Sequence, residues 1–155
     1  MLKFLFLFFL LIFSTAYASP LDDLKKQTKE PLYFSVPIQS YKIVKKGNNI
    51  NLKVKLSPYS ITAMTDRPYR QKKAIRPEEF ISYIREKQQK DLIFTLTIQQ
   101  NGQPFIINFK KQNTVYSASK DEVVFENIQI PKNVSDQIGD IKSFKGANAV
   151  LIVEG

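Results

Sequence analysis

The chain has no cysteine, no histidine and no tryptophan among its 155 residues. Without cysteine it can form neither a disulfide framework nor a catalytic thiol, and without histidine it lacks the commonest general base. The loss of both residue types also removes the usual ligands of zinc and copper. These absences predict a protein that is not an enzyme and carries no cofactor or metal, and whose stability comes from apolar burial and backbone pairing.

Short stretches that resemble catalytic or metal motifs lack their context. Ser117-Ala118-Ser119-Lys120 matches S-x-x-K, but the S-D-N and K-T-G partner motifs are missing and the stretch is typical of a turn. Asp136 and Asp140 could hold a weakly bound calcium ion, although EF-hand spacing is absent. Carboxylate pairs for glycoside hydrolysis are assembled in space, so the sequence leaves an unfamiliar hydrolase open as an alternative.

The first 18 residues have the layout of a signal peptide. Lys3 supplies a short positive region, residues 5–13 form an uninterrupted apolar run, and Ala16-Tyr17-Ala18 is an A-x-A cleavage site. The run is shorter than the roughly 20 residues that a membrane-spanning helix needs. We expect cleavage after Ala18, export of a bacterial protein to the periplasm or beyond the cell, and no transmembrane segment in the mature chain.

Downstream, apolar residues recur mainly with a period of two, which is typical of strands with one buried face. In residues 50–57, aliphatic side chains alternate with polar ones that include Lys53 and Lys55. Asn101-Gly102 between two apolar runs predicts a two-residue hairpin turn, because a type I′ turn needs positive φ at both positions. The expected strands are residues 32–36 (ended by Pro37), 41–45, 50–57, 59–65, 91–99, 105–110, 115–118, 123–130 and 148–154.

Residues 77–88 break this period and predict a helix. Pro77 suits the first helical position, Glu78 and Glu79 suit the first turn, and Arg85 suits the last. A weaker helical turn is expected within residues 134–141. Together the patterns predict a mostly β fold, either an antiparallel β-sandwich or a curved sheet, with about eight strands and one helix near residues 77–88.

The expected organisation is a signal peptide over residues 1–18, a polar leader over 19–31 and a single β-rich domain over 32–155. The leader could form a short helix capped by Ser19 with Pro20 at its first position, or it could be flexible.

Arginine is confined to one part of the chain. Three of the four arginines fall within residues 64–80, whereas lysine supplies almost all of the other positive charge. The planar guanidinium binds carboxylate or phosphate through two parallel hydrogen bonds, which lysine cannot do. We therefore expect residues 66–76, the basic segment, to be an exposed connection that binds an anion. Its candidate binding residues are Arg67, Tyr69, Arg70, Lys72, Lys73 and Arg76.

The same arginines could instead stabilise the fold. Arg67 could pair with Asp66 or with a strand-end carboxylate and fix the turn at Pro68, and Arg70 or Arg76 could close on Glu79. Asp66 and Pro68, like Asn101 and Gly102 of the hairpin, are therefore assigned structural roles.

A resemblance rests on two stretches of the chain. The pattern T-D-R-P-x-R at residues 65–70, followed by the closing N-A-V-L strand at residues 148–151, resembles small exported bacterial β-rich proteins to which no activity is assigned. The resemblance implies an exported β-rich fold and nothing about catalysis.

The favoured interpretation is a small exported binding protein, either a secreted effector or a periplasmic accessory protein, whose basic segment engages an anionic surface or an acidic protein. The formal net charge of +9 favours anionic partners such as lipid headgroups and acidic glycans without choosing among them. Export disfavours nucleic acid. The alternative is a structural or assembly module that pairs with a partner by β-strand addition.

Overall fold

The computed structural model describes residues 19–28, 31–58, 60–66, 70–87, 92–100, 102–110, 113–130, 132, 136 and 143–155. The protein is built on one nine-stranded antiparallel sheet with the order β6-β5-β9-β1-β2-β8-β7, to which β3 and β4 are attached through β1. The predicted mostly β fold with a curved antiparallel sheet is confirmed. The strands are β1 Leu32–Lys46, β2 Asn49–Leu56, β3 Ile61–Thr65, β4 Lys72–Ile75, β5 Ile93–Gln100, β6 Gln103–Phe109, β7 Asn113–Ser117, β8 Glu122–Glu126 and β9 Ser143–Glu154.

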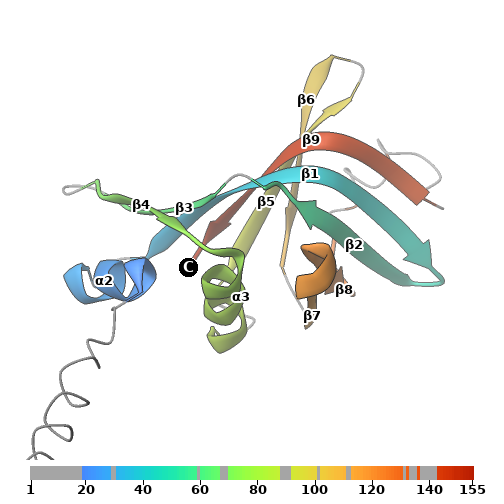
Figure 1. Ribbon diagram of the computed structural model, residues 1–155. Helices are drawn as coiled ribbons and strands as arrows, with labels where there is room; N and C mark the ends of the chain where they lie inside the picture. The colour runs from blue at the N-terminus through green and yellow to red at the C-terminus, as the bar shows by residue number, and fades with distance from the viewer. Residues whose placement is uncertain are drawn as a thin grey trace, which may run out of the picture.

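Two helices lie on the inner side of the arched sheet (Figure 1). Helix α3, Pro77–Glu86, matches the prediction over residues 77–88 apart from its last residues. The leader forms a short capped helix, α2 Pro20–Gln27, which was the first of its two possible structures. The Oγ of Ser19 caps this helix by accepting a hydrogen bond from the backbone nitrogen of Asp22 at 3.1 Å. Leu21 and Leu24 of α2 are buried, so the leader contributes to the core.

The long strand β1 lies in the middle of the sheet and pairs with different strands along its length. Its residues 32–35 pair with β3, its residues from Ile38 onward pair with β2, and β9 lies along its other edge. The sequence predicted that this strand would end at Pro37, and that prediction is wrong. Pro37 faces the side where β3 gives way to β2, since its carbonyl accepts from the nitrogen of Ser57 at 2.9 Å. Its missing N–H therefore falls where the ladder changes partner and costs little.

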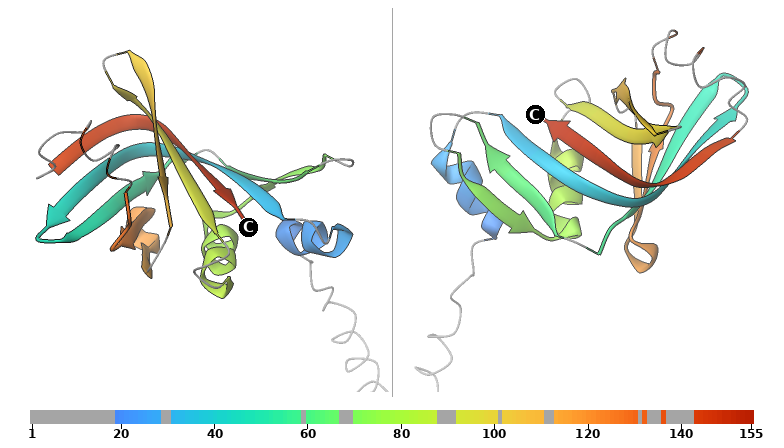
Figure 2. Two further views of the ribbon diagram at one scale, coloured as in Figure 1. Left: turned by 180° about the vertical axis from the view of Figure 1, so that it is seen from behind. Right: turned by 90° about the horizontal axis from the view of Figure 1, so that it is seen from above.

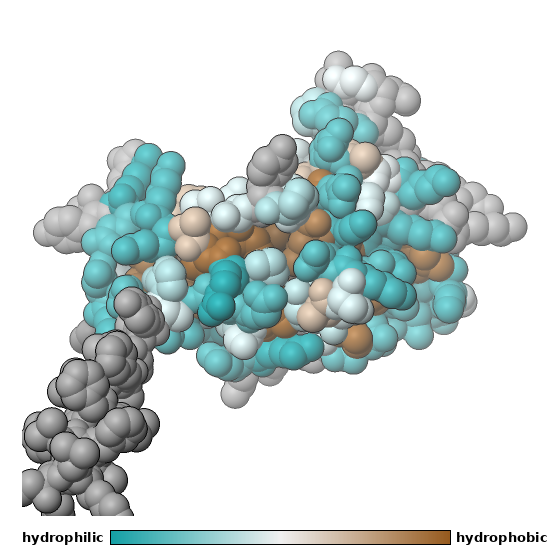
Figure 3. Space-filling view, viewed as in Figure 1, coloured by the Kyte–Doolittle hydropathy of each residue, from teal (hydrophilic) through white to brown (hydrophobic). Residues whose placement is uncertain are grey.

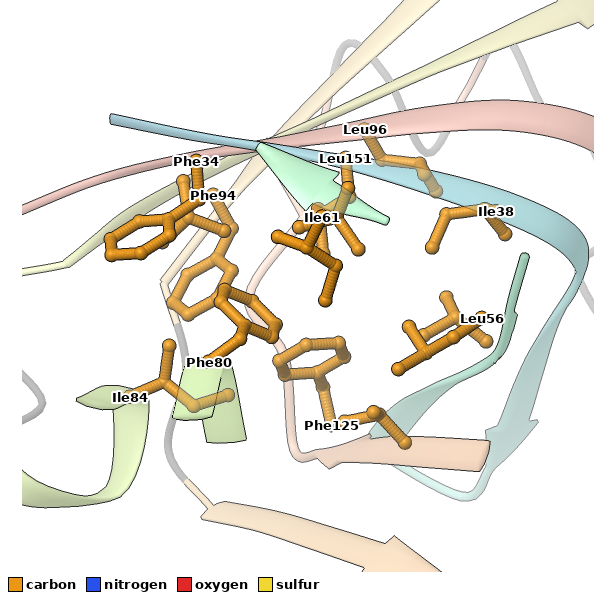
Figure 4. Close-up of a cluster of buried hydrophobic side chains, with 14 of the residues drawn as sticks. Phe34, Ile38, Leu56, Ile61, Phe80, Ile84, Phe94, Leu96, Phe125 and Leu151 are labelled. Atoms are coloured by element: carbon orange, nitrogen blue, oxygen red, sulfur yellow. The ribbon is translucent and has the colours of Figure 1, made fainter. Parts of the chain in front are cut away.

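The sheet is strongly curled (Figure 2), and side chains from strands near its two ends are in contact. Phe94 of β5 and Phe109 of β6 contact Phe125 of β8, with ring centroids 5.2 and 5.5 Å apart, although β9, β1 and β2 separate these strands in the sheet. Figure 4 shows such side chains converging from the sheet and from α3 into one buried cluster. Phe34 of β1 contacts α3 at Phe80 and Tyr83, with centroids 5.5 and 4.7 Å apart.

The predicted hairpin that joins β5 to β6 forms. Gln100 pairs with Gln103 across the loop at residues 101–102, and Gly102 has a φ of +76°. Asn101 lies outside the described residues, as does nearly all of the weak helical turn expected at 134–141. Strand β8 ends at Glu126, earlier than the predicted residue 130, because Asn127 adopts a positive φ of 53° and turns the chain. Strand β9 starts at Ser143, five residues before the predicted start.

Candidate functional site

The basic segment is only partly the open connection that the sequence predicted. Lys72–Ile75 forms strand β4, which pairs with β3 so that Ile75 lies opposite Ile61 and both are buried. The backbone of Thr65 donates to the carbonyl of Gln71 at 3.0 Å, which closes the β3–β4 hairpin. The strand was missed because Lys72-Lys73-Ala74 has no strand-like pattern of its own, and the free edge of β3 supplies the missing preference. Arg67, Pro68 and Tyr69 lie outside the described residues.

Strand geometry distributes the described cations of the segment over different surfaces. Lys73 shares the inner face of β4 with buried Ile75, whereas Lys72 points to the outer face, since side chains alternate along a strand. Arg70 and Lys72 line a hollow of about 450 Å³ on that outer face, together with Tyr33, Met64, Asp66 and Ile152. The structure therefore brings Arg70 and Lys72 together and places Lys73 elsewhere.

Arg76 lies at the start of α3 and is engaged within the fold. Its backbone nitrogen donates to Oε2 of Glu79 at 2.9 Å, and its Nε lies 3.6 Å from the same oxygen. The side chain of Arg76 is nevertheless 77% exposed, so this contact contributes little to stability and leaves most of the guanidinium in solvent. The contact between Arg76 and Glu79, which was one of the two roles expected for Arg76, is therefore present. The exposed part of its guanidinium is open to an anion, which was the other role.

The hollow beside Arg70 combines positive charge with apolar and acidic side chains. Tyr33 donates its hydroxyl proton to Oε1 of Glu154 at 3.1 Å, which holds the ring against the sheet. Asp66, which was assigned a structural role, contributes one negative charge to the lining. A ligand here would meet two cations, one carboxylate and an apolar floor, an arrangement that suits a single anionic group attached to a larger partner.

Sequence reasoning missed a second hollow on the same outer face. It has a volume of about 530 Å³, and its lining includes Lys42 of β1, Lys53 and Lys55 of β2 and Lys145 of β9. The alternation in β2 had indicated that Lys53 and Lys55 share a solvent face, but no local signal could add residues from two other strands. Those lysines become neighbours only through the pairing register of β1 with β2 and β9.

The described residues contain no group of three or more acidic, histidine or cysteine side chains placed to hold a metal ion. None of the helices within that part of the chain has the length and apolar character that a membrane crossing requires. Hydrophobic surface in the view of Figure 3 is concentrated in a band beneath the arch of the sheet, and polar side chains surround it.

Comparisons of the chain with protein-family models, with curated proteins and with solved structures found no match.

Proposed function

We propose that this protein is a small exported binding protein that is not an enzyme and that engages an anionic surface or an acidic partner protein through its basic segment. The observation that supports the proposal is the convergence of Arg70 and Lys72 on one hollow of the outer face, where Tyr33 adds an aromatic ring. Export is inferred from the signal-like residues 1–18. Bidentate hydrogen bonding by arginine gives the segment a capacity that the surrounding lysines lack.

The test compares variants at Arg70 with a matched control. Arg70→Lys keeps the charge and removes the planar fork, and Arg70→Gln removes both. Arg85→Lys and Arg85→Gln make the same changes at an exposed position of α3, outside the segment. Binding would be measured to vesicles containing phosphatidylglycerol and to poly-glutamate, over a range of salt concentrations.

We expect Arg70→Gln to weaken binding to one of these probes by about tenfold or more, because hydrogen bonds to charged groups contribute about 1.5–3 kcal/mol. Arg70→Lys should lose part of that affinity, whereas both Arg85 variants should bind like the wild type. Equal losses at positions 70 and 85 would show that only total charge matters, and unchanged binding at position 70 would refute the proposal.

Strand addition is a second candidate, favoured by the edge strand β6. Its seven residues, QPFIINF, include no charged side chain to block pairing. In a two-residue hairpin the residues that flank the loop form a hydrogen-bonded pair, so the backbone of Pro104, Ile106 and Asn108 points away from β5. Pro104 thus lacks its N–H on the free edge, where an edge strand tolerates it.

Ionic strength distinguishes the two candidates. Charge-mediated binding weakens steeply as salt rises, whereas strand addition depends on backbone hydrogen bonds and should weaken little. Ile106, which is 53% exposed, would contact an added strand. A complex that survives high salt in the wild type and is lost in Ile106→Lys would favour strand addition over the basic segment.

A further inference from the structure

A row of lysines crosses three neighbouring strands on the outer face of the sheet. Lys42 of β1 lies directly opposite Lys145 of β9 on one side and Lys53 of β2 on the other. Neighbouring strands are about 4.8 Å apart, so the three positions span roughly 10 Å across the sheet. Like charges placed directly opposite each other destabilise a sheet. The row of lysines therefore destabilises the sheet, and the strand preferences of these residues give no reason for its presence.

Very little negative charge compensates this row. Glu122 of β8 pairs with Lys53, with Nζ and Oε1 2.9 Å apart. In the described part of the chain no acidic group lies within ion-pair distance of Lys42, Lys55 or Lys145. The hollow lined by these four lysines, which we call the lysine groove, consequently keeps a net positive charge and three ammonium groups available to a ligand.

The floor of the lysine groove is made of small residues and lies beside a bend in the sheet. Ser40, Gly146 and Ala147 line the floor between the lysines. Close by, β1 has a register irregularity between Ile38 and Ser40, and Asn148 of β9 has a φ of +56°. Bulges and left-handed residues bend strands locally and are concentrated near functional sites. The bend and the small residues leave a hollow between the lysine side chains.

The chemistry of the lining discriminates among anionic partners. Membrane-binding amphipathic surfaces combine basic residues with large exposed apolar side chains, and the described residues of the groove offer none, because Tyr41 is buried. Proteins that bind single-stranded nucleic acid use exposed aromatic rings on which bases stack, and the lining residues that the structure describes include no such ring. No arginine is among the described residues of the lining, which disfavours bidentate recognition of one phosphate. What remains is a linear polymer that presents single charges at intervals.

We propose that the lysine groove binds a linear acidic polysaccharide laid across strands β9, β1 and β2, whose successive carboxylates contact Lys145, Lys42 and Lys55, the three lysines without an acidic partner among the described residues. The sugar rings lie on the small floor and the carboxylates reach the surrounding ammonium groups. This site is separate from the hollow beside Arg70, and the inference does not depend on the function proposed for the basic segment.

The test uses the mature chain and an oligogalacturonate of defined length, with neutral dextran as the blank. Lys42→Gln combined with Lys145→Gln removes two groove charges. The matched control is Lys45→Gln with Lys46→Gln, which removes two charges from exposed positions farther along β1. Double-stranded DNA and phosphatidylglycerol vesicles serve as probes of other anionic classes, and Arg70→Gln with Lys72→Gln reports on the basic segment.

We expect the groove variant to lose about tenfold or more of its affinity for the oligogalacturonate, since two charge-assisted contacts are removed. The control and the Arg70/Lys72 variant should keep wild-type affinity for it. Thermal stability of the groove variant should be unchanged or slightly higher, because opposed lysines have been removed, so lost binding could not be ascribed to unfolding. Three outcomes would overturn the proposal: no wild-type binding, equal losses in the groove and control variants, or a loss confined to DNA or vesicles.

Discussion

Gly146 lies opposite Tyr41 in the β1–β9 ladder, and the tyrosine ring occupies the space that a side chain at position 146 would fill. A Cβ added to Gly146 would lie 2.3 Å from the hydroxyl oxygen of Tyr41 and 2.5 Å from its Cζ. Normal carbon contacts are about 3.5–4.0 Å, so the ring would have to move by about 1 Å or more. Tyr41 is only 4% exposed and is packed beside Ile43 and Val54, which leaves the ring little room.

Gly146→Ala should therefore destabilise the fold by about 1–3 kcal/mol, the usual cost of overpacking a core. Urea unfolding followed by far-ultraviolet circular dichroism would measure the free energy of unfolding. Gly47→Ala is the matched control, because an added Cβ there meets nothing within 4 Å and only the positive φ of 59° is unfavourable. That control should cost about 1 kcal/mol or less.

A double-mutant cycle separates the steric clash with Tyr41 from any general destabilisation by alanine at this position of β9. Tyr41→Val removes the hydroxyl oxygen and the two ring carbons that would clash, while retaining a residue that favours strands. In that background Gly146→Ala should be neutral or slightly stabilising, since alanine has less backbone freedom to lose than glycine. The coupling energy should be about 1–3 kcal/mol. An equal cost of Gly146→Ala in both backgrounds would refute the explanation.

Four further predictions concern two residues with positive φ, one tyrosine and the N-terminus. Asn148→Gly should maintain or raise thermal stability, whereas Asn148→Val should lower it by about 1–2 kcal/mol, because φ at this position is +56°; equal melting temperatures for the two variants would contradict this. Gly102→Ala should cost about 1 kcal/mol in urea unfolding through its φ of +76°, with no steric contribution. Burial raises the pKa of Tyr83 from 10.0 to about 12, so its contribution to stability is complete below pH 10 and is lost as the pH rises towards 12; Tyr83→Phe should flatten that part of the unfolding-versus-pH curve. N-terminal sequencing of the exported protein should begin at Ser19, and a retained hydrophobic N-terminus would contradict the predicted export.

The candidate binding residues show the limit of reading sites from sequence. The clustering of Arg70, Lys72 and Arg76 is visible in the sequence, but only Arg70 and Lys72 line one hollow, whereas Arg76 lies at the start of α3. Conversely, Lys42 and Lys145 are separated by about a hundred positions in the chain and still face each other across two strands. Charge clustered in sequence and charge clustered in space are different quantities in a sheet, because side chains alternate between its faces and neighbours come from distant strands.

By itself, the sequence determined the elements whose causes are local. Alternating apolar residues specified β2, glycine with its positive φ specified the turn at Gly102, and proline with two acidic residues specified the start of α3. Each of these signals lies within a few consecutive residues, so it survives without knowledge of the rest of the chain.

Only the tertiary structure decided what depends on pairing between distant segments. Strand β4 forms because the edge of β3 is free, and β1 continues through Pro37 because its neighbour changes there. The lysine groove exists because the β1 register places Lys42 between Lys53 and Lys145. A shift of one residue would turn Lys42 into the core and remove the groove. Register is set by the burial of whole faces across the sheet, and no single stretch of sequence contains that information.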